Sequence, residues 1–419
     1  MNEYPDRFPL PPGNDWWSGL IRTSKRTDLR IEQETWLPPQ SHTTQSAGLR
    51  LATQQVIPWQ VEPESFPFIP DPFTQDRLAM LEEGLFRAAS VLRTVAGYRL
   101  FHLTVEQETS LVFLPDQPVK RKQTELWRLQ LALENRPNQL PPLWKRWGGY
   151  REPAPGEFVK LAVSMVNDPL SRLGWSQVPT GDWPVILGPG WPGLLFHEAV
   201  GHALEADNLI QGRSWLRPDS LGSAIANPLL TLSDDGTLPG GRGTETVDDE
   251  GSPVTHTVLI EKGILNGFLT NRDSARQLGL PLTGNARCER GENPPLVRMR
   301  NLIMKAGQDN PEEMIRSLKT GLFITDLEDG KCDPGTGHFS FPAGTAWLIR
   351  NGKITGRAKG AVLTGTGPET LKRIDAIGPD GYLDSSAGWC IRSGQVRPVS
   401  IGQPSVLISS LTVTSEGGQ

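Results

Sequence analysis

The chain has 419 residues, with 42 lysines and arginines against 47 aspartates and glutamates, and a formal net charge of −5. This balance argues against a protein that coats nucleic acid, because such proteins present a basic surface. Its three cysteines are odd in number and far apart, which excludes a disulfide framework and favours a reducing compartment. We expect a cytoplasmic protein without a signal peptide and without an apolar run of the roughly 18 residues that a membrane helix needs.

The amino-terminal part is expected to combine antiparallel strands with helices. Apolar and polar residues alternate at 29–36 and at 48–53, which is typical of half-buried strands. Apolar residues then recur with the helical period from Leu78 to Leu92, and Thr74 stands where an N-cap is expected. These patterns predict a sheet followed by an amphipathic helix.

A proline-rich segment at 136–156 is predicted to be a surface excursion, because proline disrupts central strands and helix interiors. A short helix is expected near 157–166. The fold class is therefore α+β, with an N-terminal α+β domain over 1–175. The second domain, over 176–419, is expected to be sheet-rich, antiparallel and barrel-like, and to carry the histidine-bearing helix described below.

The second half shows clear turn signals. Lys262–Gly263 and Asn351–Gly352 are each flanked by apolar, β-branched segments, which predicts two hairpins. Asn310–Glu313 has the cap, proline and early acids of a helix start. The acidic triplet Asp248–Glu250 is interpreted as a turn rather than a cation site. A closing strand is expected at 405–413.

Two of the six histidines, His197 and His202, stand five residues apart in a helical segment. Neutral imidazoles on a buried helix are natural zinc ligands. In a regular helix, residues five apart are rotated by roughly 140° about the axis, so the two rings would diverge. A wide turn of the π type would restore a common face, and Gly201 would ease that distortion. The spacing therefore predicts a π-bulge.

A catalytic zinc site needs a third protein ligand. The residues alone leave seven candidates open, namely Glu205, Asp207, His256, Cys288, Cys332, His338 and Cys390. Cys390 has the best local context, because it ends a loop before a glycine-rich strand region. A simpler interpretation also stays open at this point, since a helical histidine is often a hydrogen-bonded core residue.

The run from Gly188 to Asp207, GPGWPGLLFHEAVGHALEAD, closely resembles the signature of the TldD/PmbA metalloprotease family, also called modulators of DNA gyrase. The resemblance extends almost continuously over 183–419, through the segments Val247–Gly251, Val258–Leu265, Gly284–Arg287, Arg298–Asn301, Lys359–Ala361, Gly365–Glu369 and Gly402–Pro404. It implies Zn²⁺ held by His197, His202 and Cys390.

The resemblance also implies that Glu198 is the general base of a zinc-dependent peptidase that cleaves unfolded or small peptides. Because the histidine motif is intact, the chain resembles the catalytic TldD type. Glu205 and Asp207 could orient the imidazole rings, although each is expected more simply as a structural or solvated acid.

The substrate is expected to bind as an extended strand. The partners implied are a peptide and a second subunit, either another copy or a TldE/PmbA-like paralogue, with no nucleic acid and no membrane. The N-terminal domain matches the family only faintly and is shorter than usual, and the resemblance assigns no role to Cys288 or Cys332.

Two other functions remain open from the sequence. The first is a non-enzymatic scaffold or partner protein whose structural zinc is closed by a fourth protein ligand, such as Glu205. The second is hydrolysis of an amide that is not a peptide.

Overall fold

The computed structural model describes residues 17–32, 35–51, 56–58, 69, 75–92, 98–113, 118–134, 143–150, 152–166, 175–386 and 388–415. The elements before residue 175 are β1 (Trp17–Glu32), β2 (Thr35–Leu51), β3 (Val56–Pro58), α1 (Gln75–Leu92), β4 (Tyr98–Phe113), β5 (Lys120–Glu134), β6 (Leu143–Gly149) and α2 (Pro155–Val166).

The helices after residue 175 are α3 (Leu194–Ala199), α4 (Ala206–Ile210), α5 (Arg272–Leu278), α6 (Pro311–Ser317) and α7 (Gly367–Lys372), with 3-10 helices η4 (Trp191–Gly193), η5 (Gly201–Leu204) and η6 (Pro218–Ser220). The strands are β7 (Trp175–Gln177), β8 (Gly181–Leu187), β9 (Leu232–Asp235), β10 (His256–Glu261), β11 (Ile264–Leu265), β12 (Ala286–Arg287), β13 (Leu296–Val297), β14 (Asn301–Met304), β15 (Thr320–Asp326), β16 (Lys331–Cys332), β17 (His338–Pro342), β18 (Thr345–Arg350), β19 (Lys353–Lys359), β20 (Ala361–Thr366), β21 (Ile374–Ile377), β22 (Tyr382–Asp384), β23 (Trp389–Arg392), β24 (Gln395–Pro398), β25 (Ser400–Gln403) and β26 (Val406–Ser415).

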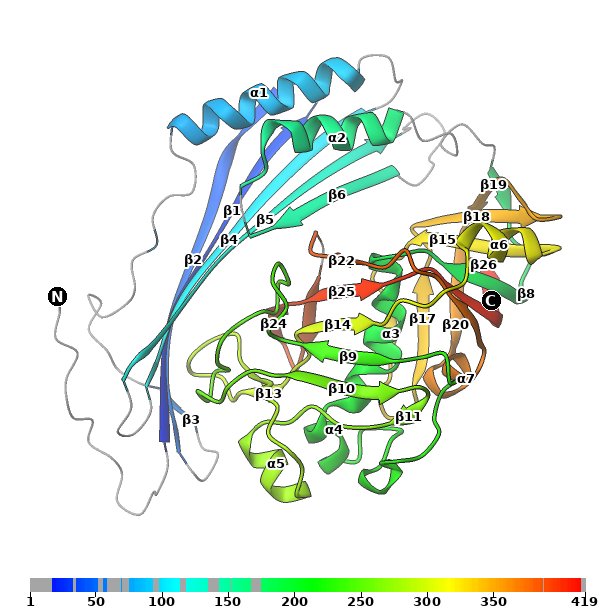
Figure 1. Cartoon of the computed structure of the whole chain (residues 1–419). Coiled ribbons are helices and arrows are strands. Elements are labelled where there is room, and N and C mark those ends of the chain that lie inside the picture. The colour runs from blue at the N-terminus through cyan, green and yellow to red at the C-terminus, as the bar shows by residue number, and fades with distance from the viewer. Residues whose placement is uncertain are drawn as a thin grey trace.

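The N-terminal part is an antiparallel sheet in the order β3-β2-β1-β4-β5-β6, and α1 and α2 cover one of its faces (Figure 1). Successive side chains of a strand point to opposite faces. Leu103, Val105, Trp127 and Leu129 accordingly point toward the helices, where they form a buried core. The other face carries charged side chains and meets the C-terminal part.

Several N-terminal predictions are confirmed. The helix ending at Leu92 is α1, the helix near 157–166 is α2, and the two alternating segments lie largely in β1 and β2. Thr74, the expected N-cap, lies outside the described residues. The prediction that 136–156 is a proline-rich surface excursion is wrong in part, because β6 occupies 143–149 as the end strand of the sheet. That stretch contains no proline, and an end strand tolerates prolines nearby.

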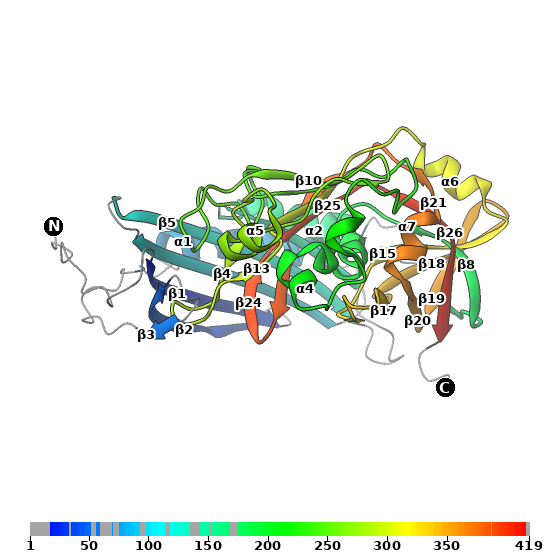
Figure 2. The same ribbon diagram turned by 90° about the horizontal axis from the view of Figure 1, so that it is seen from below.

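The C-terminal part contains two large sheets (Figures 1 and 2). One has the strand order β11-β10-β9-β14-β25-β22, and the other follows β16-β17-β20-β26-β8-β15-β18-β19-β7, with β21 paired to β26. The α+β class is confirmed. The prediction of antiparallel pairing is wrong for three described pairs, β14 with β25, β8 with β15 and β7 with β19, which are parallel. These pairs join segments far apart in sequence.

Neither large sheet closes on itself in the described pairings, so barrel-like closure finds no support there. Instead, side chains of α3 and η5 lie in one buried cluster together with residues of both sheets. Leu195 and Phe196 are fully buried in it, alongside Leu302 of β14 and Leu322 of β15. The histidine-bearing segment is therefore held by packing on several sides.

Both predicted hairpins are confirmed. β10 and β11 meet at Lys262–Gly263, and β18 and β19 meet at Asn351–Gly352. All four turn residues have positive φ, with 47° and 80° in the first turn and 49° and 73° in the second. This is the pattern of a type I′ turn, whose twist matches that of paired strands.

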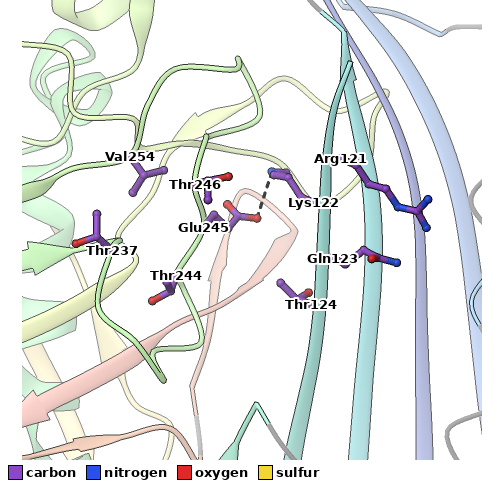
Figure 3. Close-up of a pocket in the computed structure, with 9 residues that line it drawn as sticks. All are labelled: Arg121, Lys122, Gln123, Thr124, Thr237, Thr244, Glu245, Thr246 and Val254. Carbon is purple, nitrogen blue, oxygen red and sulfur yellow. Dashed lines mark hydrogen bonds and ion pairs between the residues drawn. The ribbon is translucent and has the colours of Figure 1, made fainter. Parts of the chain in front are cut away.

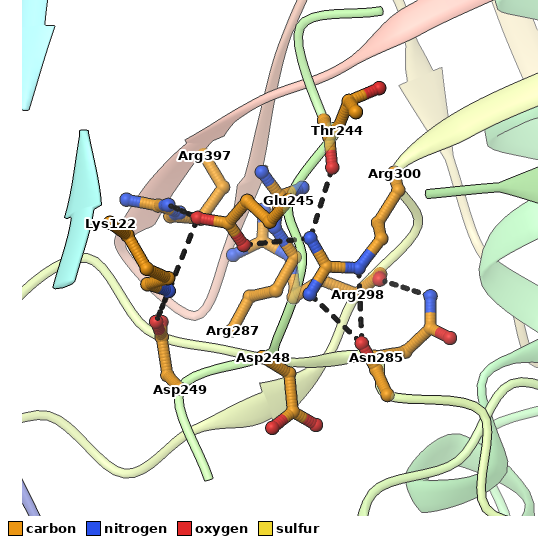
Figure 4. A network of polar contacts seen from close by, with 12 residues as sticks. Lys122, Thr244, Glu245, Asp248, Asp249, Asn285, Arg287, Arg298, Arg300 and Arg397 are labelled. Carbon is orange, nitrogen blue, oxygen red and sulfur yellow. Dashed lines mark hydrogen bonds and ion pairs between the residues drawn. The ribbon is translucent and has the colours of Figure 1, made fainter. Parts of the chain in front are cut away.

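The two parts meet through a network of buried ion pairs (Figure 4). Asp249 contacts Arg22 of β1, at 2.8 Å, and also Lys122 of β5, and its side chain is fully buried. Burial would raise the pKa of Asp249, but Arg22 and Lys122 hold it well below its usual range. Charges removed from water must be paired, so this contact fixes how the sheet sits on the C-terminal part.

The network has further pairs and a neighbouring cavity. Arg397 contacts Glu108 of β4 at 2.7 Å, and Glu245 contacts Arg300 at 2.7 Å and Lys122 at 3.2 Å. A cavity of about 520 Å³ opens beside Lys122 and Glu245 (Figure 3). Each part has its own apolar core, and the division into domains at 175/176 stays a prediction.

Among the described helices, none is both long and apolar enough to cross a membrane.

Replacing Asp249 by alanine should destabilise the protein by about 3–5 kcal/mol, because Arg22 and Lys122 would both lose a buried counter-charge and would keep only Glu108 and Glu245 as their partners. The free energy of unfolding in urea measures this loss. Glu312→Ala is the matched control, since it breaks only an exposed pair with Arg316 and should change stability by less than about 0.5 kcal/mol. Equal effects of the two substitutions would contradict the role assigned to Asp249.

Candidate metal centre

The approach to the two histidines explains why glycine and proline precede them. β8 ends at Leu187, and the chain turns at Gly190, whose φ of 82° disfavours other residues. A Cβ on Gly193 would stand 2.5 Å from a methyl group of Ile401. The turn therefore brings the start of α3 into close contact with β25, and the helix enters the core directly.

The predicted π-bulge is wrong. α3 ends at Ala199, Val200 has φ −125° and ψ −50°, and the chain continues as the 3-10 helix η5. This interruption turns the chain between His197 and His202, so that their ring centroids lie 5.2 Å apart with planes at 85°. A break in the helix, rather than a wide turn, therefore brings the two imidazole rings close together.

Gly201 has a different role from the one expected. It does not appear among the residues with positive φ, but a Cβ at this position would overlap Met299 Sδ. Met299 is fully buried beside η5. The glycine is required because the segment packs closely on Met299, rather than because its backbone is distorted.

His197, His202 and Cys390 come together, although Cys390 lies 188 residues beyond His202. One ligand atom from each lies within 4.8 Å of the others, and all three residues are buried. His202 Nε2 is 3.3 Å from Cys390 Sγ. Within the described part of the chain, neither ring nitrogen of His197 has a hydrogen-bond partner. A buried imidazole without partners is costly, so this cluster fits a metal ion that would accept those lone pairs.

Electrostatics favour the ligand form of the Cys390 side chain. Burial would raise the pKa of the Cys390 thiol, but His202 and Arg298 hold it well below its usual range. Arg298 also donates to the backbone carbonyl of Cys390. A thiolate is the form that binds metals, and the surroundings stabilise it before any metal arrives.

Glu205 contacts His202. Its carboxylate lies 2.9 Å from His202 Nδ1, which leaves Nε2 for the cluster. Burial would raise the pKa of Glu205, but His202 and Arg392 lower it to about 2. Asp207 is linked to Glu205 through Arg392. It lies 2.9 Å from Arg392, and Arg392 lies 3.0 Å from Glu205. Such carboxylate–histidine contacts set the orientation of metal ligands.

Glu198 lies where the cluster meets solvent. Its carboxylate is 3.6 Å from His202 Nε2 and its side chain is 28% exposed. It lines a cleft of about 600 Å³. The Cys332 thiol lies 3.1 Å from the backbone carbonyl of Glu198 and donates to it, a contact that sequence reasoning missed because the two residues are 134 positions apart.

The other candidate ligands lie elsewhere. His256 is exposed and pairs with Asp235 at 3.4 Å, and His338 is exposed in β17. Cys288 is buried beside Asp249, and burial raises the pKa of its thiol. Neither these residues nor Cys332 belongs to the three-residue cluster identified among the described residues.

Comparison with known proteins places the C-terminal part in a family. Residues 180–415 match the family model described as the PmbA/TldA metallopeptidase C-terminal domain. A metalloprotease TldD homolog of Haemophilus influenzae is 41% identical over 255 residues, which cover 61% of this chain and 53% of that protein. A zinc metalloprotease TldD homolog of Saccharolobus solfataricus is 32% identical over 249 residues, covering 58% and 54%. The chain spans about half the length of the curated relatives it matches.

The similarity in fold covers more of the chain than the similarity in sequence. The structure of TldE from Thermococcus kodakarensis superposes with a TM-score of 0.73 over 96% of this chain and 97% of that chain, at 16% identity. At such low identity the comparison shows the fold alone, and it includes the N-terminal sheet.

Replacing Gly201 by alanine should destabilise the protein by about 1–3 kcal/mol, because the new methyl group overlaps Met299 Sδ. Thermal unfolding measures the change. In a Met299→Ala background the same substitution should cost clearly less, since the space is then open. An equal cost in both backgrounds would show that packing against Met299 is not the reason for the glycine.

Proposed function

The chain belongs to the PmbA/TldD metallopeptidase family, and we propose that it is a zinc-dependent peptidase acting on unfolded or small peptides. The observation that carries the proposal is the buried cluster of His197, His202 and Cys390, in which no described residue forms a hydrogen bond with the His197 ring. Two imidazoles and a thiolate are a ligand set that suits zinc and leaves a fourth position for water.

Zinc bound there would acidify a water molecule and polarise the carbonyl of the scissile peptide bond. Glu198 is the proposed general base. Its Oε2 faces His202 Nε2 and its side chain reaches the cleft, so it can take a proton from water and deliver it to the leaving amine. The hydrogen bond from Cys332 to the Glu198 carbonyl holds the end of α3 in place.

We propose that the peptide binds as an extended strand. β16 is the last strand of the ten-stranded sheet in the described pairings, and its Cys332 lies next to Glu198. A peptide added along such an edge would form main-chain hydrogen bonds beside the cleft, which requires little sequence preference. This mode suits unfolded substrates.

The rival function is a non-enzymatic scaffold with a structural zinc closed by Glu205. The oxygens of Glu205 are already engaged by His202 Nδ1, by Arg392 and by the backbone N–H of Met299. A fourth ligand from this residue would break those contacts, which favours the peptidase. A digest of a peptide library separates peptide cleavage from hydrolysis of another amide.

The proposed assembly is a dimer, formed with a second copy or with a TldE/PmbA-like paralogue. The structural likeness to TldE supports pairing of related subunits. Light scattering of the purified chain, alone and with a paralogue, distinguishes the two forms.

Replacing Glu198 by glutamine should leave zinc bound at one ion per chain and lower kcat for peptide cleavage by about 10²–10⁴-fold, because the amide cannot accept the proton. Zinc content and a peptide digest are measured on the same sample. Glu369→Gln, at an exposed carboxylate paired with Arg373, is the control and should retain full activity. Retained cleavage in Glu198→Gln would refute the proposed base.

Replacing Glu205 by glutamine should weaken zinc binding by about 10–100-fold, because His202 loses the carboxylate that orients it. Competition with a chelator measures the affinity. Asp207→Asn should have a smaller effect, since Asp207 contacts Arg392 rather than a histidine. If both variants bind zinc like the unaltered chain, Glu205 does not orient the ligand.

A further inference from the structure

The cleft that contains Glu198 has walls from both parts of the chain. Arg128, on the charged face of β5, lines one side together with Arg146 of β6. Trp389 of β23 lines the cleft as well, while its neighbour Cys390 is buried on the other side of the strand. The cleft therefore joins the N-terminal sheet to the proposed metal site.

Trp389 is surrounded by cations. The guanidinium of Arg128 lies 4.5 Å from the ring centroid, that of Arg242 lies 4.8 Å away and that of Arg26 lies 5.3 Å away. Such stacking fixes the plane of a guanidinium without using its hydrogen-bond donors.

Arg128 differs from Arg146 and Arg242 in having no ion pair among the described residues, and Glu106 acts on it only from a greater distance. Arg242 contacts Glu106 at 2.9 Å, and Arg146 contacts Asp326 at 2.7 Å. No described carboxylate lies within ion-pair distance of Arg128, and its buried Nε has no hydrogen-bond partner. Burial, together with repulsion from Arg146 and Arg242, lowers the pKa of Arg128 to about 9. An anion bound here would relieve that repulsion.

Acidic side chains in the same cleft restrict what that anion can be. Glu328 and Asp329 line the same cleft, and Glu198 lies within it. A ligand with many negative charges, such as a nucleic acid, would be repelled by these carboxylates. A ligand with one carboxylate on an otherwise neutral or cationic chain fits a cleft that carries charges of both signs.

We propose that Arg128, stacked on Trp389, binds a carboxylate of the peptide substrate and thereby determines which peptides are cleaved. This inference rests on the proposed peptidase function. The planar fork of arginine matches a carboxylate with two parallel hydrogen bonds. Because Trp389 is adjacent to Cys390, the subsite lies within a few extended residues of Glu198, at about 3.3 Å per residue. The peptide's C-terminal carboxylate and an acidic side chain are the two sources of this group.

Three related peptides test the proposal. The first has a free C-terminus, and the second has the same sequence with a C-terminal amide. The third also ends in an amide, but its last residue is glutamate. The unaltered chain should cleave the free acid with a kcat/KM about 10–100-fold above that of the amide, the range expected for a charge-assisted pair. Recovery of activity with the glutamate amide would assign the group to a side chain. Equal kcat/KM for all three peptides would overturn the subsite.

Arg128→Gln should abolish the preference by raising KM for the free acid while leaving the amide peptide unchanged. Arg128→Lys keeps the charge but loses the fork, so it should retain part of the preference. Arg121→Gln is the matched control, because Arg121 lies on the same strand and points away from Glu245 in Figure 3. A preference that survives Arg128→Gln would overturn the assignment.

Binding separates this proposal from the peptidase function. In the Glu198→Gln background, calorimetry with the free acid and the amide should show the same 10–100-fold preference, lost when Arg128→Gln is added. If the unaltered chain cleaves neither peptide but binds the acid through Arg128, the peptidase proposal fails and the subsite stands. If it cleaves both equally and binds both equally, the subsite fails and the peptidase proposal stands.

Discussion

The pairing of buried charges between the two parts of the chain is the constraint on which the rest of the structure depends. Asp249 is fully buried and has two cationic partners, one on β1 and one on β5, so the sheet can dock in only one position without leaving a charge unpaired. Lys122 and Arg128 lie six residues apart on one face of β5, about 20 Å along a rigid strand. Docking at one end therefore places Arg128 in the cleft at the other.

The same principle operates around the histidines. His202, Glu205, Arg392 and Asp207 form a chain in which each charge touches one of opposite sign, and Arg298 holds the carbonyl of Cys390. His202 and Cys390 are held by contacts that do not use the atoms facing the cluster. The ring nitrogens of His197 are the exception in this region, because they are buried and have no hydrogen-bond partner among the described residues. The proposed metal would complete the pairing.

Local chemistry was predictable from the sequence, and long-range packing was not. The Asn351–Gly352 hairpin and α6 follow from residues within a few positions of each other, and both are confirmed. The break at Val200 was missed, and the close packing of Gly201 on Met299 could not be predicted because Met299 lies far along the chain. The acidic triplet at 248–250 does form a turn, but no sequence pattern indicated that it would be buried against Arg22 and Lys122. Likewise, the alternation of side chains along β5 predicts that Arg128 and Trp127 point to opposite faces of the sheet. It does not predict that Arg128 stacks on Trp389, which lies far along the chain.

The most direct test of the proposed metal site is X-ray absorption at the zinc edge of the purified chain loaded with one equivalent of zinc. The account predicts a first shell of one sulfur, two imidazole nitrogens and one exchangeable oxygen, with the sulfur lost in Cys390→Ser. A shell without sulfur, or one of four protein ligands with no exchangeable position, would contradict it.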